Sequence, residues 1–137
     1  MIKVRFSAED VKSQKLLDPG KYGFVVTSIK QGVTKEKKAT KWTWVFTGFT
    51  GAAKDVPVIR IYTEEYQEFM LALLTKGFGL EFSEEDGGEI DLEALKGRKI
   101  WLVTTIGEFG GSKRNEMAGF APWEDGGPEE TEALQAA

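Results

Sequence analysis

The residues with the most evident chemistry are lysines that gather in one short polar stretch. Four of them fall within seven residues and a fifth comes just before: Lys30, Lys35, Lys37, Lys38 and Lys41. Ammonium groups attract phosphate and release its condensed counterions, so such a cluster gives affinity with little sequence preference. Exposed lysines also serve solubility alone, and Glu36 neutralises part of this cluster. The stretch therefore predicts phosphate binding only together with other features.

A second basic tip lies in the glycine-rich segment GEFGGSKR, residues 107–114. Its candidate ligand contacts are Phe109, Lys113 and Arg114, and its glycines let a backbone approach a ligand closely. An ordinary hairpin turn has the same composition. Two basic tips that a fold places on one side are a stronger indication than either alone.

Aromatic residues between these stretches could stack on nucleobases, at about 1–3 kcal/mol per base. Trp42, beside the lysines, and Trp101, opposite the aliphatic side of its strand, are the expected exposed rings, with Arg60 and Tyr62 as further candidates. Most aromatic residues are core, however. The expected core consists of Phe24, Phe46, Phe69, Leu73, Ile100 and Leu102, and Trp44 is expected to join Phe46 there.

The chain lacks two common catalytic residue types, because its 137 residues include neither cysteine nor histidine. Thiolate nucleophiles, cysteine-rich zinc sites and histidine triads are thereby excluded. The acids Glu84, Glu85 and Asp86 lack the pattern of a calcium loop, and GEFGG is no phosphate-binding loop, since no Gly-Lys-Ser/Thr follows it. We expect a binding protein rather than an enzyme, with no cofactor and no metal.

Charge is segregated along the chain although the net charge is only -4. Residues 1–60 hold twelve basic and five acidic residues, and residues 61–95 hold one basic and ten acidic residues. Residues 96–122 hold five basic and two acidic residues, whereas residues 123–137 hold five acids and no base. A fold that joins the first and third blocks would create a positive face.

Strand patterns dominate the chain. Residues 18–30, 41–49, 56–62, 98–106 and 115–120 are rich in β-branched and aromatic residues, and the polar residues 31–41 predict a long flexible hairpin tip. Pro57 belongs at a strand start or an open edge. The one helix expected is residues 63–77, with Thr63 as N-cap and a buried stripe of Tyr66, Phe69, Met70, Leu73 and Leu74.

The element order predicts a mainly β protein: a five-stranded Greek-key β-barrel with its α-helix between strands 3 and 4, the OB fold. One domain, residues 1–122, is expected, followed by a disordered acidic C-terminal tail, residues 123–137. A short helical turn should be capped by Asp91 and end at Gly97. The first residues, MIKVRFSAEDVKSQ, predict neither signal peptide nor membrane span, so a soluble cytoplasmic protein is expected.

Residues 18–137 resemble the small single-stranded DNA-binding proteins encoded by bacteriophages. The similar segments are PGKYGFVV, the lysine-rich hairpin before an aromatic strand, a helix containing LALL, then LKGRKIWLVTT and SKRNEMAGFAP followed by acids. The resemblance implies an OB fold that coats unwound DNA during replication, recombination or repair, in the host cytoplasm. It also implies an acidic tail that contacts other replication or recombination proteins.

Carried over by position, the resemblance makes Lys35, Lys37, Lys38 and Lys41 phosphate contacts and adds Lys113 and Arg114 from the second loop. The partner-binding tail would then consist of Trp123, Glu124, Asp125, Glu129, Glu130 and Glu132. Single-stranded DNA or RNA is the expected partner. The sequence does not decide whether the chain forms a homo-oligomer.

Two other classes of function also stay open. A protein-interaction or assembly module with an OB-like barrel would use exposed rings and sheet edges to dock a partner, without binding nucleic acid. A nuclease would need acids and Mg²⁺ near the basic face, whereas the acids concentrate in residues 61–95.

Overall fold

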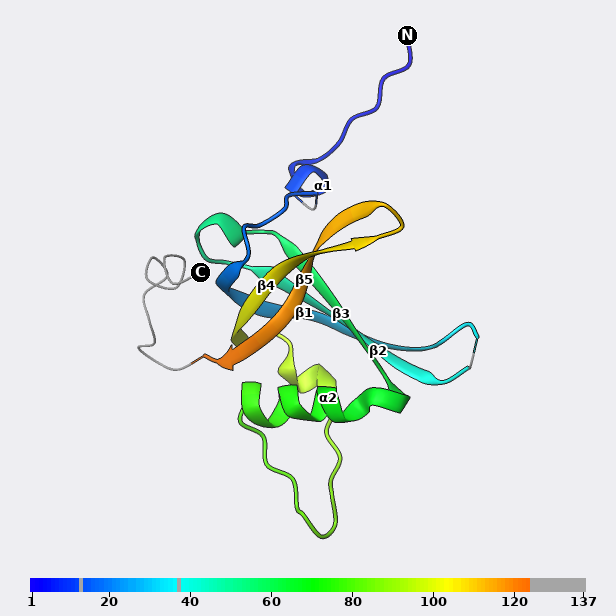
Figure 1. Cartoon of the computed structure of the whole chain (residues 1–137), viewed down its shortest axis with the longest axis vertical. Helices are drawn as coiled ribbons and strands as arrows, with labels where there is room; N and C mark the ends of the chain where they lie inside the picture. The colour runs from blue at the N-terminus through cyan, green and yellow to red at the C-terminus, as the bar shows by residue number, and fades with distance from the viewer. Residues whose placement is uncertain (13, 37, 124–137) are drawn as a thin grey trace.

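The computed structural model describes residues 1–12, 14–36 and 38–123, and its main feature is one antiparallel sheet of five strands (Figure 1). The strands are β1 (Gly20–Val33), β2 (Thr40–Gly48), β3 (Pro57–Thr63), β4 (Lys99–Phe109) and β5 (Ser112–Pro122). Their order in the sheet is β3-β2-β1-β4-β5. The prediction of a mainly β chain with five strands is confirmed. Pro57 begins the edge strand β3, where its missing amide hydrogen costs no ladder bond.

The long strand β1 organises the sheet because it pairs with two neighbours. Its first part, from Gly20 to Val25, pairs with β4, and the part from Phe24 to Val33 pairs with β2. A bulge at Thr27 inserts one extra residue, which brings Ile29 back to the buried face that Phe24 and Val26 occupy. Strict alternation from Phe24 and Val26 would instead place Ile29 on the opposite face. The outer strands β3 and β5 also contact each other, which curls the sheet toward a barrel.

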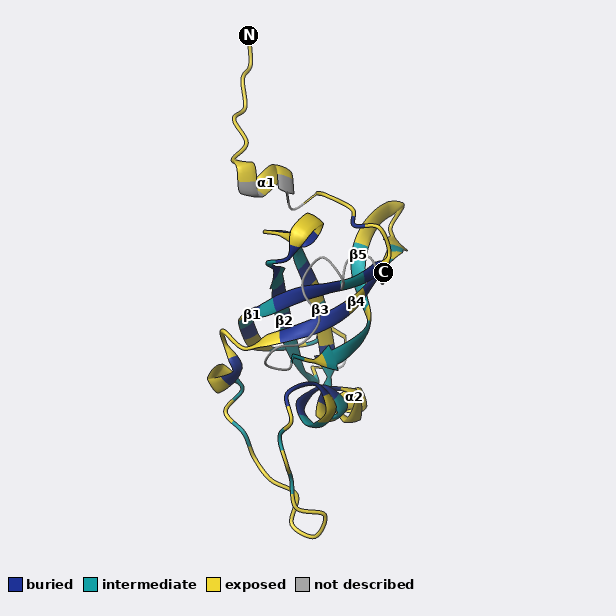
Figure 2. Ribbon diagram, turned by 90° about the vertical axis from the view of Figure 1, so that its left-hand side faces the viewer, coloured by how far each residue is buried: buried dark blue, intermediate teal, exposed yellow. Residues whose placement is uncertain are grey.

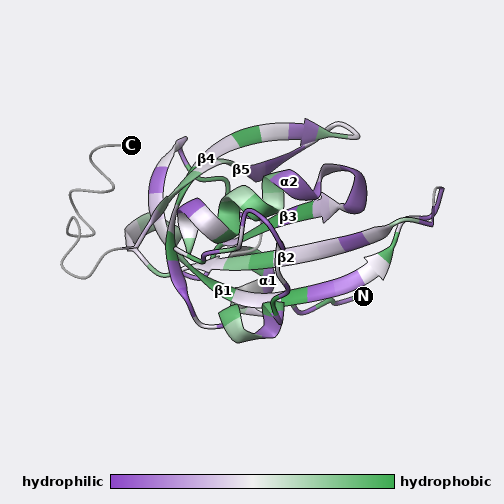
Figure 3. Ribbon diagram, turned by 90° about the horizontal axis from the view of Figure 1, so that it is seen from below, coloured by the Kyte–Doolittle hydropathy of each residue, from purple (hydrophilic) through white to green (hydrophobic). Residues whose placement is uncertain are grey.

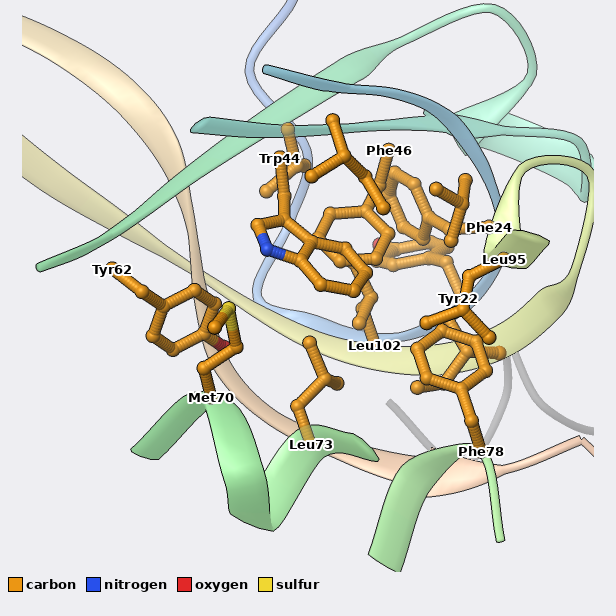
Figure 4. Packing of buried hydrophobic residues seen from close by; sticks show 14 of the residues in the cluster. Tyr22, Phe24, Trp44, Phe46, Tyr62, Met70, Leu73, Phe78, Leu95 and Leu102 are labelled. Carbon is orange, nitrogen blue, oxygen red and sulfur yellow. The ribbon is translucent and has the colours of Figure 1, made fainter. Parts of the chain in front are cut away.

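The core lies between the curled sheet and helix α2 (Gln67–Ala72), and Trp44 is at its centre (Figure 4). The Trp44 ring stacks on Phe46, with centroids 5.8 Å apart, and on Phe78 at 6.2 Å. The predicted burial of Phe24, Phe46, Leu73, Ile100 and Leu102, and of Trp44, is confirmed. Phe69 contradicts its prediction, because 54% of its surface is exposed.

The helical region is a composite of three short pieces. A 3-10 turn, η2 (Glu64–Tyr66), leads into α2, which continues as the π-helical turn η3 (Leu73–Gly77). Thr63 stands at the N-cap but its side chain makes no capping hydrogen bond. At the other end a Cβ on Gly77 would lie 2.8 Å from Cδ1 of Ile100, so a side chain at this position would have to displace the end of the Ile100 side chain.

Two segments project from opposite ends of the molecule. Residues 1–7 extend away from the sheet and lead to the short helix α1 (Ala8–Lys12), whereas an acidic loop, residues 78–91, hangs below α2 (Figures 1 and 2). After this loop Asp91 accepts a hydrogen bond from the amide of Glu93 at 3.0 Å and caps the 3-10 turn η4 (Leu92–Leu95), as predicted. Gly97 ends this segment with a φ of 84°. In the described part of the chain, no helix is both long and apolar enough to span a bilayer.

Candidate nucleic-acid interface

The β1–β2 hairpin carries the lysine cluster. The strands run to Val33 and from Thr40, so the connection is shorter than the predicted long tip. Thr34 closes it: its amide donates to the carbonyl of Ala39 at 2.8 Å, and its carbonyl accepts from the amide of Lys38 at 3.1 Å. Lys30, Lys35 and Lys38 are exposed and Lys41 is half-buried, while Lys37 lies outside the described residues. The hairpin thus presents ammonium groups on a closed turn.

The β4–β5 hairpin turns at Gly110 and Gly111, whose φ values of 58° and 84° favour glycine. Phe109 is 71% exposed, and the Arg114 guanidinium lies 5.0 Å from its ring centroid. Nε of Arg114 also pairs with Oε1 of Glu116 at 3.2 Å. This tip is therefore less basic than the sequence block suggests, because Lys96, Arg98 and Lys99 lie before or at the start of β4, away from the turn.

Both hairpins extend toward the same side of the molecule, with β3 between them (Figures 1 and 3). The β1–β2 tip is strongly hydrophilic (Figure 3). The space near β3 contains two hollows that share Thr63 and Tyr66 in their linings. One, of about 400 Å³, reaches Lys35 on the hairpin, and the other, of about 450 Å³, reaches Arg60 and Phe69.

A pair of exposed rings lines these hollows: Tyr66 lines both, and Phe69 lines the one that reaches Arg60. Tyr66 and Phe69 are 52% and 54% exposed, and their ring centroids are 6.2 Å apart with planes tilted by 37°. We call Lys35, Arg60, Tyr66 and Phe69 together the ring surface. Glu36 and Glu65 also line it at the hairpin end, so its charge is mixed rather than uniformly positive.

Arg60 is the cation of the ring surface with the most constrained position. It lies half-buried on the inner face of β3, with its guanidinium 5.0 Å from the Tyr62 ring centroid. Its Nε is buried and has no hydrogen-bond partner in the described part of the chain. Burial raises the pKa of the Tyr62 phenol above its ordinary value, and the charge of Arg60 acts in the opposite direction. Nε itself is closed to solvent, so a ligand in the hollow could meet only the remainder of the half-buried guanidinium.

Three of the predicted aromatic contacts do not offer an open ring on this surface. Tyr62 is 3% exposed and forms part of the core, so its face is not open to a base. Trp42 is half-buried, donates from Nε1 to Oε1 of Gln31 at 3.2 Å, and lines hollows on the acidic side of α2. The expected exposure of Trp101 is wrong, because only 2% of its surface remains accessible.

Trp101 is covered by a small aromatic cluster on the outer face of the sheet. Trp123 lies on it with ring centroids 4.4 Å apart, and Phe49 packs against Trp123 at 5.2 Å. Nζ of Lys99 lies 5.1 Å from the Phe49 centroid, and Nζ of Lys21 lies 5.4 Å from the Trp101 centroid. Trp123, predicted to open the tail, thus packs on the folded domain. The tail acids Glu124, Asp125, Glu129, Glu130 and Glu132 lie outside the described residues.

Sequence reasoning missed the ring surface because Tyr66 and Phe69 fit the helical spacing of a buried stripe. One signal in the sequence could have indicated the ring surface. The predicted helix, residues 63–77, carries five large apolar or aromatic residues, which is more than a short helix can bury against a small sheet. Comparisons with known proteins add no assignment, since no family model and no curated protein matches the chain.

Proposed function

We propose that this chain has an OB fold and binds single-stranded DNA without sequence preference. The supporting fold features are the strand order, with β1 between β2 and β4, and the contact of β3 with β5. In an OB fold the loops between strands 1 and 2 and between strands 4 and 5 flank the ligand. Here the corresponding loops are the two hairpins that extend toward one side.

The observation that carries the proposal is the exposed ring pair between two cations. Tyr66 and Phe69 offer flat faces on which successive bases stack, and every base has such a face. Lys35 on one side and Arg60 on the other would hold the phosphates. The bound strand would therefore run along β3 from the β1–β2 hairpin, across the two rings.

The β4–β5 hairpin would form the second flank of the same site. Phe109 offers a further exposed ring, and Lys113 adds an exposed ammonium group. Binding of phosphate by Arg114 would compete with its ion pair to Glu116, so this flank contributes less than the lysine hairpin. The expected role is coating unwound DNA during replication, recombination or repair. In that role the acidic tail would contact other proteins.

A salt titration with labelled oligo-dT tests the proposal. Fluorescence anisotropy of the labelled strand is the suitable signal, because the two rings of the ring surface are not tryptophans and tryptophan quenching would report on other sites. The logarithm of the affinity should fall with the logarithm of salt concentration, with a slope of about -0.7 per phosphate contacted.

Two results would overturn the proposal. No binding, or binding that is indifferent to salt, would leave the protein-interaction module as the better explanation of the exposed rings. Cleavage of the labelled strand after addition of Mg²⁺ would instead indicate a nuclease.

A further inference from the structure

The first residues of the chain form an exposed arm with an alternating pattern. Ile2, Val4 and Phe6 are 96%, 70% and 68% exposed, and they alternate with Lys3 and Arg5. In an extended chain such alternation puts the apolar side chains on one face and the cations on the other. The arm extends away from the sheet beyond α1 (Figures 1 and 2), and the exposed fractions show that its apolar side chains are largely uncovered. Its apolar face is therefore unpartnered within the described chain.

An apolar groove lies at the other end of the molecule, between α2 and the acidic loop. It consists of two adjoining hollows of about 770 and 740 Å³ that share four lining residues: Trp42, Met70, Leu74 and Ile90. Leu71 and Phe82 extend the apolar wall of the second hollow. Leu71 is 45% exposed, so the groove is accessible from solvent.

The rim of this groove is acidic. Glu68 and Glu84 line one hollow, and Glu89, Asp91 and Glu93 line the other. Among the described residues that line the two hollows, none is a lysine or arginine. Lys96 pairs with Glu93 at 3.3 Å and offsets one of these charges, but both side chains are exposed and such a pair is weak. We call the two hollows, with their apolar floor and these five rim carboxylates, the acidic groove.

We propose that residues 2–6 of one copy of the chain dock in the acidic groove of a second copy. Ile2, Val4 and Phe6 would face the apolar floor, while the stems of Lys3 and Arg5 lie along the wall with their charged ends at the rim carboxylates. The arm and the groove are complementary in two ways. The apolar side chains of the arm match the apolar floor of the groove, and the cations of the arm match the carboxylates at its rim. An intramolecular contact is unsuitable, because the arm and the groove lie at opposite ends of the molecule (Figure 1).

The symmetry of such a contact has a consequence. Arm and groove are different surfaces, so one arm-in-groove contact by itself is heterologous. Two copies that exchange arms would fill both grooves and close as a dimer, whereas association without exchange would continue into rings or open chains. The proposal needs no nucleic acid, so its success or failure is separate from that of the DNA-binding proposal.

Sedimentation velocity of the whole chain, without nucleic acid, is the first test. The unmodified chain should associate as its concentration rises. Val4→Asp should raise the dissociation constant by about tenfold or more, because it places a carboxylate on an apolar, acidic surface. Val11→Asp is the matched control: Val11 is 64% exposed in α1, outside the docking segment, and its replacement should leave association unchanged.

A charge exchange tests which surfaces meet. Lys3→Glu/Arg5→Glu and Glu68→Lys/Glu84→Lys should each weaken self-association, and a mixture of the two variants should restore it. Restoration on mixing supports the proposal, because each variant alone offers only mismatched charges, whereas in the mixture the unmodified arm of one variant meets the unmodified groove of the other and the reversed arm meets the reversed groove. A chain that stays monomeric up to about 1 mM, equal effects of Val4→Asp and Val11→Asp, or a mixture no better than its components would each overturn it.

Discussion

The ring surface and the acidic groove lie on two flanks of the same helix. Phe69 of α2 belongs to the ring surface, whereas Leu71, two residues later, lines the groove. Both surfaces combine apolar side chains with half-exposed rings. They differ in the charges at their edges: the first has Lys35 and Arg60 together with Glu36 and Glu65, whereas the second has five carboxylates and no lining lysine or arginine among the described residues. An exposed ring therefore does not by itself indicate a ligand, and the neighbouring charge decides between a polyanion and a basic segment.

The helix separates these surfaces because it buries only a narrow stripe. Met70, Leu73 and Leu74 face the core, and Gly77 lets the end of the helix approach β4. Phe69 and Leu71 flank this stripe on either side and stay 54% and 45% exposed. The same short element thus provides one wall of each surface.

The largest expected effect is on the core that both surfaces share. Trp44→Ala removes a fully buried ring that stacks between Phe46 and Phe78, so the free energy of unfolding should fall by about 3–5 kcal/mol. Urea denaturation measures this. Oligo-dT binding and self-association should then disappear together. Disappearance of one with the other intact would show that the two surfaces do not depend on a common core.

The next effect should distinguish the two surfaces. Phe69→Ala should weaken oligo-dT binding by about 1–3 kcal/mol, because it removes one stacking ring, while thermal stability changes little at this exposed position. Trp42→Ala is the matched control, since Trp42 lines the acidic groove instead. It should leave oligo-dT affinity nearly unchanged and weaken self-association. The reverse result would move the stacking site to Trp42, where the sequence alone places it.

Much of the sheet can be predicted because its signals are local. Alternation along β4 predicts Ile100 and Leu102 as core, and Gly110-Gly111 predicts the turn that follows. The bulge at Thr27 cannot be predicted, because one inserted residue leaves no mark in the pattern of single residues and yet moves Ile29 to the other face. The sequence also predicts β4 and β5 too short, since hydrogen bonding carries both strands into the polar residues beside their turn.

The site is harder to predict because exposure depends on contacts between distant residues. Trp101 is covered in part by Trp123, which follows it by more than twenty residues and lies next to acids typical of a tail. Lys35 and Arg60 are candidates by residue type alone, and the structure places them beside adjoining hollows. Helical spacing assigns Tyr66 and Phe69 to the core, because spacing cannot tell how wide a stripe the sheet covers.

A smaller effect is expected from the lysines of the hairpin. Lys35→Ala/Lys38→Ala should weaken oligo-dT binding and make the salt slope shallower by about 0.7 for each phosphate that the variant no longer neutralises. Lys54→Ala/Lys76→Ala is the matched control, because both lysines are exposed and line none of the hollows of the ring surface. Anisotropy at several salt concentrations measures both slopes. Equal slopes in the two double variants would show that the charge acts through the whole chain rather than through the hairpin.

The smallest effect concerns the phenol beneath the ring surface. The pKa of Tyr62 is raised by burial and lowered in part by the charge of Arg60. The folded-state pKa of Tyr62 exceeds the unfolded value of 10.0, so the folded state favours the neutral phenol. The contribution of this phenol to the stability of the fold is complete below pH 10.0 and is lost as pH rises through the folded pKa. Tyr22, whose pKa is also raised by burial, shares the effect. Tyr62→Phe should therefore make the alkaline loss of stability shallower without removing it.

The titration of Tyr62 in the presence of oligo-dT tests whether Arg60 contacts the bound strand. If Arg60 donates to a bound phosphate, its charge is shared with the ligand and opposes the effect of burial on Tyr62 less strongly. The pKa of the Tyr62 phenol should then rise further in the complex, as tyrosinate absorbance measured with and without the strand would show. Tyr62→Phe removes this group from the titration and so identifies its share of the signal. An unchanged titration would place Arg60 outside the bound strand's reach and leave Lys35 and the two rings as the contacts.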